Sequence, residues 1–348
     1  MARKISRRQF VKTTAGTVVG AGVLLNSGAG LAAGQDKKSK IIEVFSKNAV
    51  GKERKVDAQV VRKMVQSGTR ALAGGKNLFA ELFGTKDVVG LKINCLGRPR
   101  IHTHHELVAA FSEELKAAGV KPENIIVWDR FQQHMTDCGF KMNPQGPGVR
   151  VKATESYRGD DACLDDEDPY VCTPGNPEGS SEDKVVCRFS RIFTRECNKH
   201  INLAIMKDHG RAGVTLCLKN IAFGVCDNNR RFHGFDEIGP FISGVCAKKG
   251  VMDRFVLYVL DGLEGCYDGG PRPGSSEPIF THNRLWLGFD PVAIDTLGAR
   301  VIDDRRKQAG MRSLAKSGRP PKHIEMSARL GLNTHEKKGI DVEKIDLT

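Results

Sequence analysis

The 348-residue sequence contains ten cysteines but no Cys-x-x-Cys pair. Without that spacing, ferredoxin-type clusters, zinc ribbons and c-type haem attachment have no local support. Gly-x-Gly-x-x-Gly, Walker-type and nucleophile-elbow motifs are also missing, so the common signatures of dinucleotide, nucleotide and hydrolase sites are absent. Aromatic residues are scarce, at 6%, and neither an aromatic RNA-binding motif nor a zinc-finger spacing occurs.

Acidic residues are too few to balance the basic ones, which leaves a formal net charge of +13. Five positive charges lie within the first twelve residues, and the others are spread along the chain. A clustered basic run or basic helix is lacking, so we expect no nucleic-acid partner and interpret most Lys and Arg side chains as solvated.

The N-terminus carries the most specific motif. The segment "SRRQFVK" has the paired Arg7 and Arg8, followed by Phe10, of a twin-arginine (Tat) signal peptide. A weakly apolar stretch rich in Gly and Thr follows and ends in small residues, which predicts a signal over residues 1–33 and a linker over 34–40. An uncleaved membrane anchor is the alternative, but this stretch is diluted by polar residues and no later segment is apolar enough to span a bilayer.

This motif predicts a periplasmic or otherwise extracytoplasmic protein whose partner during export is the Tat translocase. Because that pathway carries folded proteins, it favours a metal or cofactor inserted before export, of unknown identity. The oxidising compartment also favours disulfides of unknown pairing. Cys217 and Cys226, which flank a Lys-Asn pair, are one candidate pair, and the other candidates are Cys163, Cys172, Cys187 and Cys197.

Hydrophobic periodicity predicts an α/β fold, a mostly parallel sheet flanked by helices. Apolar runs at 41–46, 87–94, 124–130, 200–207 and 255–262 predict strands, and amphipathic patterns at 56–75 and 103–119 predict helices. Thr103 and Glu106 stand in capping-box register, and Asp290 and Pro291 have the spacing of a helix start. We expect a single domain over 41–348, with a loop-rich, Cys-containing insertion at about 140–198.

Polar residues recur where the apolar strands end, and the carboxyl ends of parallel strands form the crevice where ligands bind in such folds. Gly210 and Gly213 predict a turn after the strand that carries Lys207 and His209, and the following "VTLCL" is predicted to be a second strand. The predicted strand-end residues are Lys92, Asn94, Asp129, Arg130, Lys207, His209, Lys219, Asn220 and Asp261. Three lysines in one crevice would suit an anionic ligand.

Histidines near these ends offer further chemistry. His102 could line the crevice. His104 and His105 fall in the first turn of a predicted helix, and we interpret them as surface residues. A metal site would combine His102, His209 or His233 with Asp129 or Asp261, but no local ligand spacing supports it. The metal site therefore remains unknown.

Seven segments give the sequence a recognisable family pattern: "VGLKIN", "THHELVAAF", "VWDR", "INLAIMKDHGRAGVTLCLKNIAFG", "RRFHG", "VLDGLEG…GGPRPG" and "GFDPVAIDTLGAR". With them the chain resembles the domain-of-unknown-function family 362 from about residue 40 to 305, most specifically at 200–235. The resemblance implies functional positions at Lys92, Asn94, Asp129, Lys207, His209, Thr215, Lys219, Asn220, Arg231, His233, Asp261, Asp290 and Asp295. Asp290 is interpreted as a helix cap and Asp295 lies within that helix, so neither is taken as a site residue. Ile93 replaces the family's usual Pro, and the ferredoxin motifs of many relatives are missing.

Three functions remain open. The first is an exported protein that binds an anionic small molecule or cofactor at these lysines and acts as an enzyme, with His209, His233 or Asp129 as general acid or base. The second is a non-catalytic periplasmic binding or assembly factor for redox proteins. The third is a metal or iron–sulfur redox protein that uses Cys and His.

Overall fold

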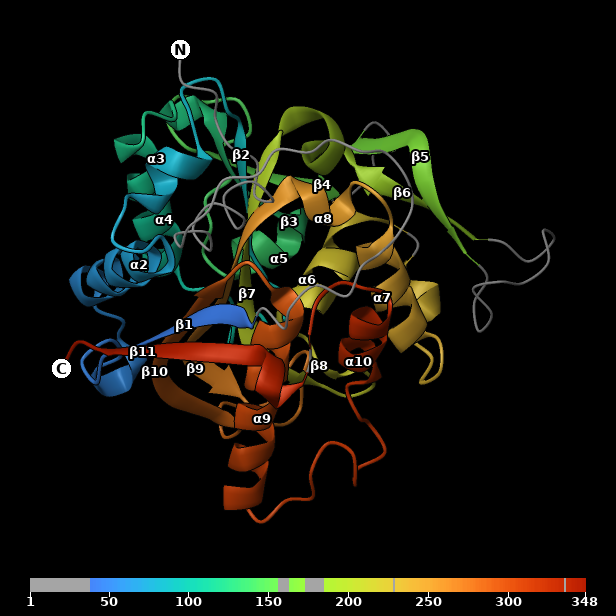
Figure 1. The fold of residues 1–348 in the computed structure, drawn as a ribbon. Coiled ribbons are helices and arrows are strands. Elements are labelled where there is room, and N and C mark those ends of the chain that lie inside the picture. The colour runs from blue at the N-terminus through green and yellow to red at the C-terminus, as the bar shows by residue number, and fades with distance from the viewer. Residues whose placement is uncertain (1–37, 156–162, 173–184, 228, 335) are drawn as a thin grey trace, which may run out of the picture.

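The computed structural model describes residues 38–155, 163–172, 185–227, 229–334 and 336–348. A nine-stranded mixed sheet runs through the molecule (Figure 1). Only β10 runs against its neighbours along the main path, so the predicted mostly parallel α/β fold is confirmed. In spatial order the strands are β11 (Ile340–Asp346), β1 (Ser39–Phe45), β10 (Ile279–Gly288), β9 (Phe255–Cys266), β7 (Lys199–His209), β2 (Val89–Lys92), β3 (Ile125–Phe131) and β4 (Arg150–Glu155), with β8 (Gly213–Val214) paired to the end of β7.

Helices cover both faces of this sheet (Figure 1). Two apolar cores lie between the sheet and the helices, one on each face of the sheet. Every residue of β9 is buried between these cores. On the first face lie α2 (Ala58–Leu72), α3 (Leu78–Leu82), α4 (His105–Ala117) and α5 (Gln132–Asp137); on the second lie α6 (Leu216–Val225), α7 (Ile238–Ala247), α8 (Val251–Arg254), α9 (Pro291–Gln308) and α10 (Lys322–Arg329).

The start of α9 follows the predicted cap, because Asp290 accepts hydrogen bonds from Val292 N and Ala293 N. The capping box predicted at Thr103 is wrong. His104 occupies the N-cap of α4 without a side-chain cap, and the Thr103 hydroxyl instead donates to Leu203 O at 2.8 Å. This hydrogen bond links the loop before α4 to β7.

The predicted insertion at 140–198 is only partly separate from the sheet. Its β4 pairs in parallel with β3 and forms one edge of the main sheet. A two-stranded ribbon, β5 (Leu164–Cys172) and β6 (Val185–Ser190), follows, and Figure 1 shows it reaching away from the sheet. The sequence missed β4 because the surrounding Gly and Pro residues obscured its short apolar alternation.

The strand predicted at "VTLCL" is also wrong. After the turn, only Gly213 and Val214 pair with β7, and the chain then enters helix α6 at Leu216. Lys219 and Asn220 consequently lie in the first turns of a helix rather than at a strand end. An apolar run this short does not distinguish a buried helix from a buried strand.

The disulfide predicted for Cys217 and Cys226 is not formed, because both are free thiols buried in the core. Cys197 is free as well. Cysteine at these positions packs as a small apolar residue. The predicted signal, with Arg7, Arg8 and Phe10, lies outside the described residues. Among the described helices, none combines the length and apolar character needed to cross a membrane.

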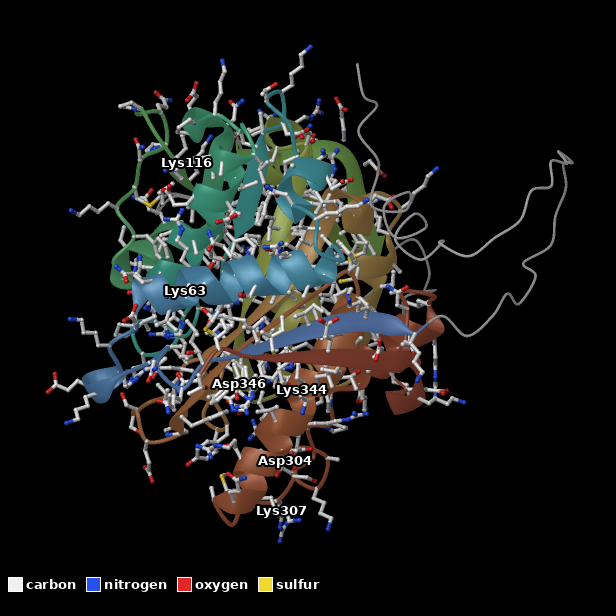
Figure 2. All side chains as sticks on the ribbon, turned by 60° about the vertical axis from the view of Figure 1, so that its left-hand side comes forward. Lys63, Lys116, Asp304, Lys307, Lys344 and Asp346 are labelled. Carbon is white, nitrogen blue, oxygen red and sulfur yellow. The ribbon has the colours of Figure 1, made fainter. Side chains whose placement is uncertain are left out.

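Basic side chains are distributed over different elements of the fold. Figure 2 shows Lys63 on α2, Lys307 at the end of α9 and Lys344 on β11, each far along the chain from the others. All three are exposed, which agrees with the interpretation of most of the positive charge as solvated.

Candidate functional site

A fully hydrogen-bonded polar network lies buried at the ends of β2, β3 and β7. The Lys92 ammonium donates to Asp129 Oδ1 at 2.8 Å, to Ile93 O at 2.6 Å and to Asn220 Oδ1 at 3.2 Å. The other oxygen of Asp129 accepts from Cys95 N at 2.7 Å. Burial opposes ionisation of Asp129, but the Lys92 charge and these donors lower the pKa of its carboxyl. Asp129 is therefore the ionised partner of Lys92, and both of its oxygens accept hydrogen bonds.

Amide side chains extend the network to Lys207. Asn220 Oδ1 also accepts from Asn94 Nδ2 at 2.9 Å, and Asn94 Oδ1 accepts from Lys207 Nζ at 2.6 Å. Burial lowers the pKa of Lys207 to about 8, although the Asp129 charge opposes this shift. We call Lys92, Asn94, Asp129, Lys207 and Asn220 the closed network, because each of these side chains has a partner within it.

Helix α6 is held in place from a second helix. Asp295 of α9 accepts hydrogen bonds from Cys217 N at 2.7 Å and Leu218 N at 2.9 Å, and so satisfies two free N–H groups at the start of α6. Burial raises the pKa of Asp295 to about 8. This anchor fixes the first turns of α6, which present Lys219 and Asn220 to the ends of the strands.

The turn before α6 is equally constrained. Gly213 has a φ of +77°, and a Cβ there would lie 2.5 Å from Arg319 O and 2.9 Å from Pro321 N. Only glycine allows this close approach. The contact brings the segment that leads into α10 against the end of β7, and α10 then contributes His323.

A second group of polar side chains lacks hydrogen-bond partners. Among the described residues, no partner is found for His209 Nε2, for Thr215 Oγ1 or for either ring nitrogen of His323, all of which are buried. Lys219 is 2% exposed, and its Nζ lies 3.7 Å from the Phe223 ring centroid. Within the same part of the chain it has no hydrogen-bond acceptor either. We call Lys219, His209, Thr215 and His323 the donor cluster.

Electrostatic interactions place Lys219, His209 and His323 close together. Burial and the charge of Lys219 lower the pKa of both His209 and His323, the latter to about 3. Thr215 is the N-cap of α6, and its N–H donates to Lys207 O at 3.0 Å. Burial and the neighbouring Lys207 charge lower the pKa of Lys219 to about 7, and no carboxylate contributes to that shift.

The protonation of His209 follows from its hydrogen bonds. Its Nδ1 faces Arg211 N and Ala212 N, each at 3.1 Å, and both are donors. Nδ1 must therefore be the unprotonated acceptor, and the hydrogen of the neutral ring lies on Nε2. His209 thus presents a hydrogen-bond donor to the cluster, and Nδ1 is unavailable as a base.

His233 and a small cavity lie next to the donor cluster. The His233 ring centroid is 6.0 Å from that of His209, and burial lowers the pKa of His233 to about 4. A cavity of about 30 Å³ is bordered by Arg211, Lys322 and His323. That volume accommodates a group no larger than about two water molecules.

Two predicted residues, His102 and Asp261, belong to a second polar group, centred on His104. The His104 ring contacts Asp261 Oδ2 at 2.9 Å and Glu264 Oε2 at 3.3 Å, and Arg54 donates to Glu264. Burial alone would lower the pKa of His104, but the two carboxylates raise it to about 10. His102 and His104 border a cleft of about 530 Å³ beside Arg54.

The structure therefore divides the predicted site. The closed network and the donor cluster contain Lys92, Asn94, Asp129, Lys207, His209, Thr215, Lys219 and Asn220, with His233 at the border. Arg231 is exposed on the surface. Sequence reasoning missed His323. The family resemblance implied Asp295, but it was left out of the predicted site because it lies within a helix. His104 was interpreted as a surface residue although it is 8% exposed.

Metal binding finds no arranged ligand set here. Across the described residues, no group of three or more His, Cys, Asp or Glu side chains is placed to hold a metal ion. The donor cluster offers the His209 N–H, the Thr215 hydroxyl, one N–H of the neutral His323 ring and the Lys219 amine, and these donors match the oxygen atoms of an anion.

Comparison with known proteins gives a family without an assigned activity. A family model described as a domain of unknown function (DUF362) matches residues 89–300. This chain belongs to the DUF362 family. The matched segment contains every member of the closed network and of the donor cluster except His323, which α10 supplies from beyond it.

Other comparisons add little to the DUF362 assignment. Among curated proteins, none matches this sequence. A Thermotoga maritima protein with a crystal structure from a structural genomics programme is similar at 10% identity and a TM-score of 0.43. The alignment covers 73% of this chain and 59% of the length of that protein.

Proposed function

We propose that this DUF362 protein is exported through the twin-arginine pathway and that its donor cluster binds one or two oxygen atoms of a small anion. The observation that supports binding is the set of buried donors without acceptors around Lys219. A buried polar group left without a partner costs about 1–3 kcal/mol. A ligand that supplies oxygen acceptors would remove several such costs at once.

Charge favours an anion over a neutral ligand. Lys219 and the nearby Lys207 contribute positive charge, and His209 contributes a fixed N–H. The only carboxylate of the closed network, Asp129, is already paired with Lys92. An incoming carboxylate or phosphate would therefore meet uncompensated donors in a site of low polarity, where charged hydrogen bonds are strong.

General acid–base chemistry at such a site would rest on Lys219 rather than on His209. The pKa of Lys219, at about 7, places its proton exchange near neutral pH. His209 has its Nδ1 occupied by two backbone donors and serves to hold the ligand. Asp129 accepts three hydrogen bonds on its two oxygens, which argues against its use as a base.

Isothermal titration with inorganic phosphate and with lactate tests the proposal. We expect saturable binding of at least one anion, which Lys219→Met weakens by at least about tenfold through loss of a charge-assisted hydrogen bond. Lys307→Met, at an exposed lysine in the last turn of α9, is the matched control and should leave the affinity unchanged. Saturable binding that survives Lys219→Met would contradict the proposed location.

A further inference from the structure

The cavity of about 30 Å³ lies where α7 and α10 pack side by side (Figure 1), next to the turn that follows β7. His323 lines it from α10, and Arg211 and Ala212 line it from the turn. The backbone N–H groups of Arg211 and Ala212 also donate to His209 Nδ1, each at 3.1 Å. The cavity therefore adjoins the donor cluster at two of its members, His209 and His323.

His323 brings an unsatisfied side chain to this cavity. It is 1% exposed, and within the described residues neither of its ring nitrogens has a hydrogen-bond partner. Two backbone donors fix the tautomer of His209, whereas no such contact fixes that of His323, so its N–H can lie on whichever nitrogen faces the cavity. An oxygen atom in the cavity would supply the acceptor that His323 lacks.

The charged residues that border the cavity are cations. Arg211 and Lys322 line it, and no Asp or Glu is among the described residues that do. Arg211 donates to His233 O at 2.8 Å but forms no ion pair within the described chain, and Lys322 has an exposed contact of 3.4 Å with Asp236. Exposed ion pairs of this kind are weak, so both cations remain available to an anion.

The volume of the cavity limits what can enter it. Space for about two water molecules matches the two oxygen atoms of a carboxylate. A benzene ring needs a cavity of about 150 Å³, so a ring cannot follow the carboxylate inside. The remainder of a larger acid must therefore lie outside, against the residues at the mouth of the cavity.

Phe235 is placed to contact that remainder. It lines the cavity and is 54% exposed, whereas the other exposed large apolar residues of the described chain do not border this cavity; they are Val171, Val186 and Leu330. The Arg211 guanidinium lies 5.5 Å from the centroid of the Phe235 ring. An exposed aromatic face next to a cation is a surface on which a second aromatic ring can stack.

We propose that the donor cluster receives its anion through this cavity and that the anion is an aromatic carboxylic acid, whose carboxylate enters the cavity while its ring packs on Phe235. This inference rests on the proposed anion binding and specifies the class of ligand. The His323 N–H and the charges of Arg211 and Lys322 would hold the carboxylate. Phe235 would then select aromatic acids over acids without a ring.

Calorimetric titration with phenylacetate and with acetate tests this selection, because the two acids share a carboxylate and differ by the ring. We expect phenylacetate to bind the wild-type chain at least about fivefold more tightly than acetate, as an aromatic contact predicts. Phe235→Ala should remove this preference and leave the affinity for acetate unchanged. Leu330→Ala is the matched control, at a residue 55% exposed that does not line the cavity, and should retain the preference.

Gly239→Ala tests the cavity itself. Gly239 lines it from α7, and a Cβ there would lie 3.4 Å from Met326 Sδ and 3.5 Å from Lys322 Cβ, which are ordinary contacts. Because alanine is also favoured over glycine inside a helix, the variant should unfold at no lower temperature than the wild type. Its methyl group would occupy part of the cavity, so both acids should bind at least about tenfold more weakly.

The possible failures are distinguishable. If the two acids bind equally, or if Phe235→Ala keeps the preference for phenylacetate, the aromatic class is refuted and anion binding stands. Unchanged binding of both acids by a folded Gly239→Ala variant refutes the cavity as the entrance. If phosphate, lactate, acetate and phenylacetate all fail to bind, both proposals fail and the cavity holds water only.

Discussion

Replacement of Asp129 by asparagine should strongly destabilise the fold. Asp129 receives donors on both oxygens: Lys92 Nζ at 2.8 Å and Arg130 N at 2.8 Å on Oδ1, and Cys95 N at 2.7 Å on Oδ2. Asparagine has one oxygen, so its NH₂ group must face one of these donors. The Lys92 ammonium, which is fully buried, loses its counter-charge at the same time.

The magnitude follows from the burial of the pair. Removal of one partner of a buried ion pair costs about 3–5 kcal/mol because the remaining charge has no compensation. Typical domains unfold with only about 5–15 kcal/mol, so Asp129→Asn should remove a large share of the stability. Asp129 contributes through a lowered pKa, so its contribution is full above the unfolded value of about 3.9 and is lost as the pH falls through the folded value.

Urea unfolding followed by circular dichroism measures the effect. Asp236→Asn, at an exposed carboxylate 3.4 Å from Lys322, is the matched control and should change little. In the double variant with Lys92→Met, the loss should be smaller than the sum of the single losses by about 0.5–3 kcal/mol. A single-variant loss below about 1 kcal/mol, or strict additivity, would refute the buried-pair reasoning.

Three further outcomes can be measured. Above pH 7 the affinity for an anion should fall by up to about tenfold per pH unit, because Lys219, whose pKa is about 7, loses its proton. Calorimetric titration with the anion at values from about pH 6 to about pH 9 would show this loss of affinity. Gly213→Ala should cost about 3 kcal/mol of unfolding free energy, since its Cβ would lie 2.5 Å from a backbone oxygen at positive φ, whereas Gly210→Ala, with 3.5 Å of clearance, should cost much less. Replacement of both Arg7 and Arg8 by Lys should leave the precursor in the cytoplasmic fraction on immunoblotting, and normal export would contradict the signal assignment.

Most strands and helices were predictable because their apolar periods are strong and local. β7 and α9 are examples: the first is a continuous buried run, and the second starts with an Asp-Pro cap. Helix α6 was not predictable in this way, because all but one of its ten residues are buried and its pattern has no polar side. Its identity as a helix depends on the Asp295 anchor, which is 78 residues away in sequence.

Half of the site was predictable from strand ends. Lys92, Asp129 and Lys207 meet because the carboxyl ends of adjacent parallel strands converge, and that convergence follows from the fold class alone. The separation of Asp261 from them was not predictable, since it depends on a partner, His104, supplied by the loop before α4. His323 gave no sequence signal because it is a single histidine on a short amphipathic helix.

The hydrogen bonds of the buried lysines distinguish those that stabilise the fold from the one available for function. Lys92 and Lys207 have partners, and their loss should destabilise the protein. Lys219 has no acceptor in the described chain, so Lys219→Met should raise the unfolding free energy by about 1–3 kcal/mol while weakening anion binding by at least about tenfold.

The pH dependence of that gain has a definite sign. The folded pKa of Lys219, about 7, lies below the unfolded value of about 10.4, so the cost of burying its charge is full below pH 7 and is relieved as the pH rises toward 10. The stability gained by Lys219→Met should therefore be largest in acid and shrink in base. A destabilised Lys219→Met variant would mean that the amine has a structural partner, and would remove the argument for a ligand.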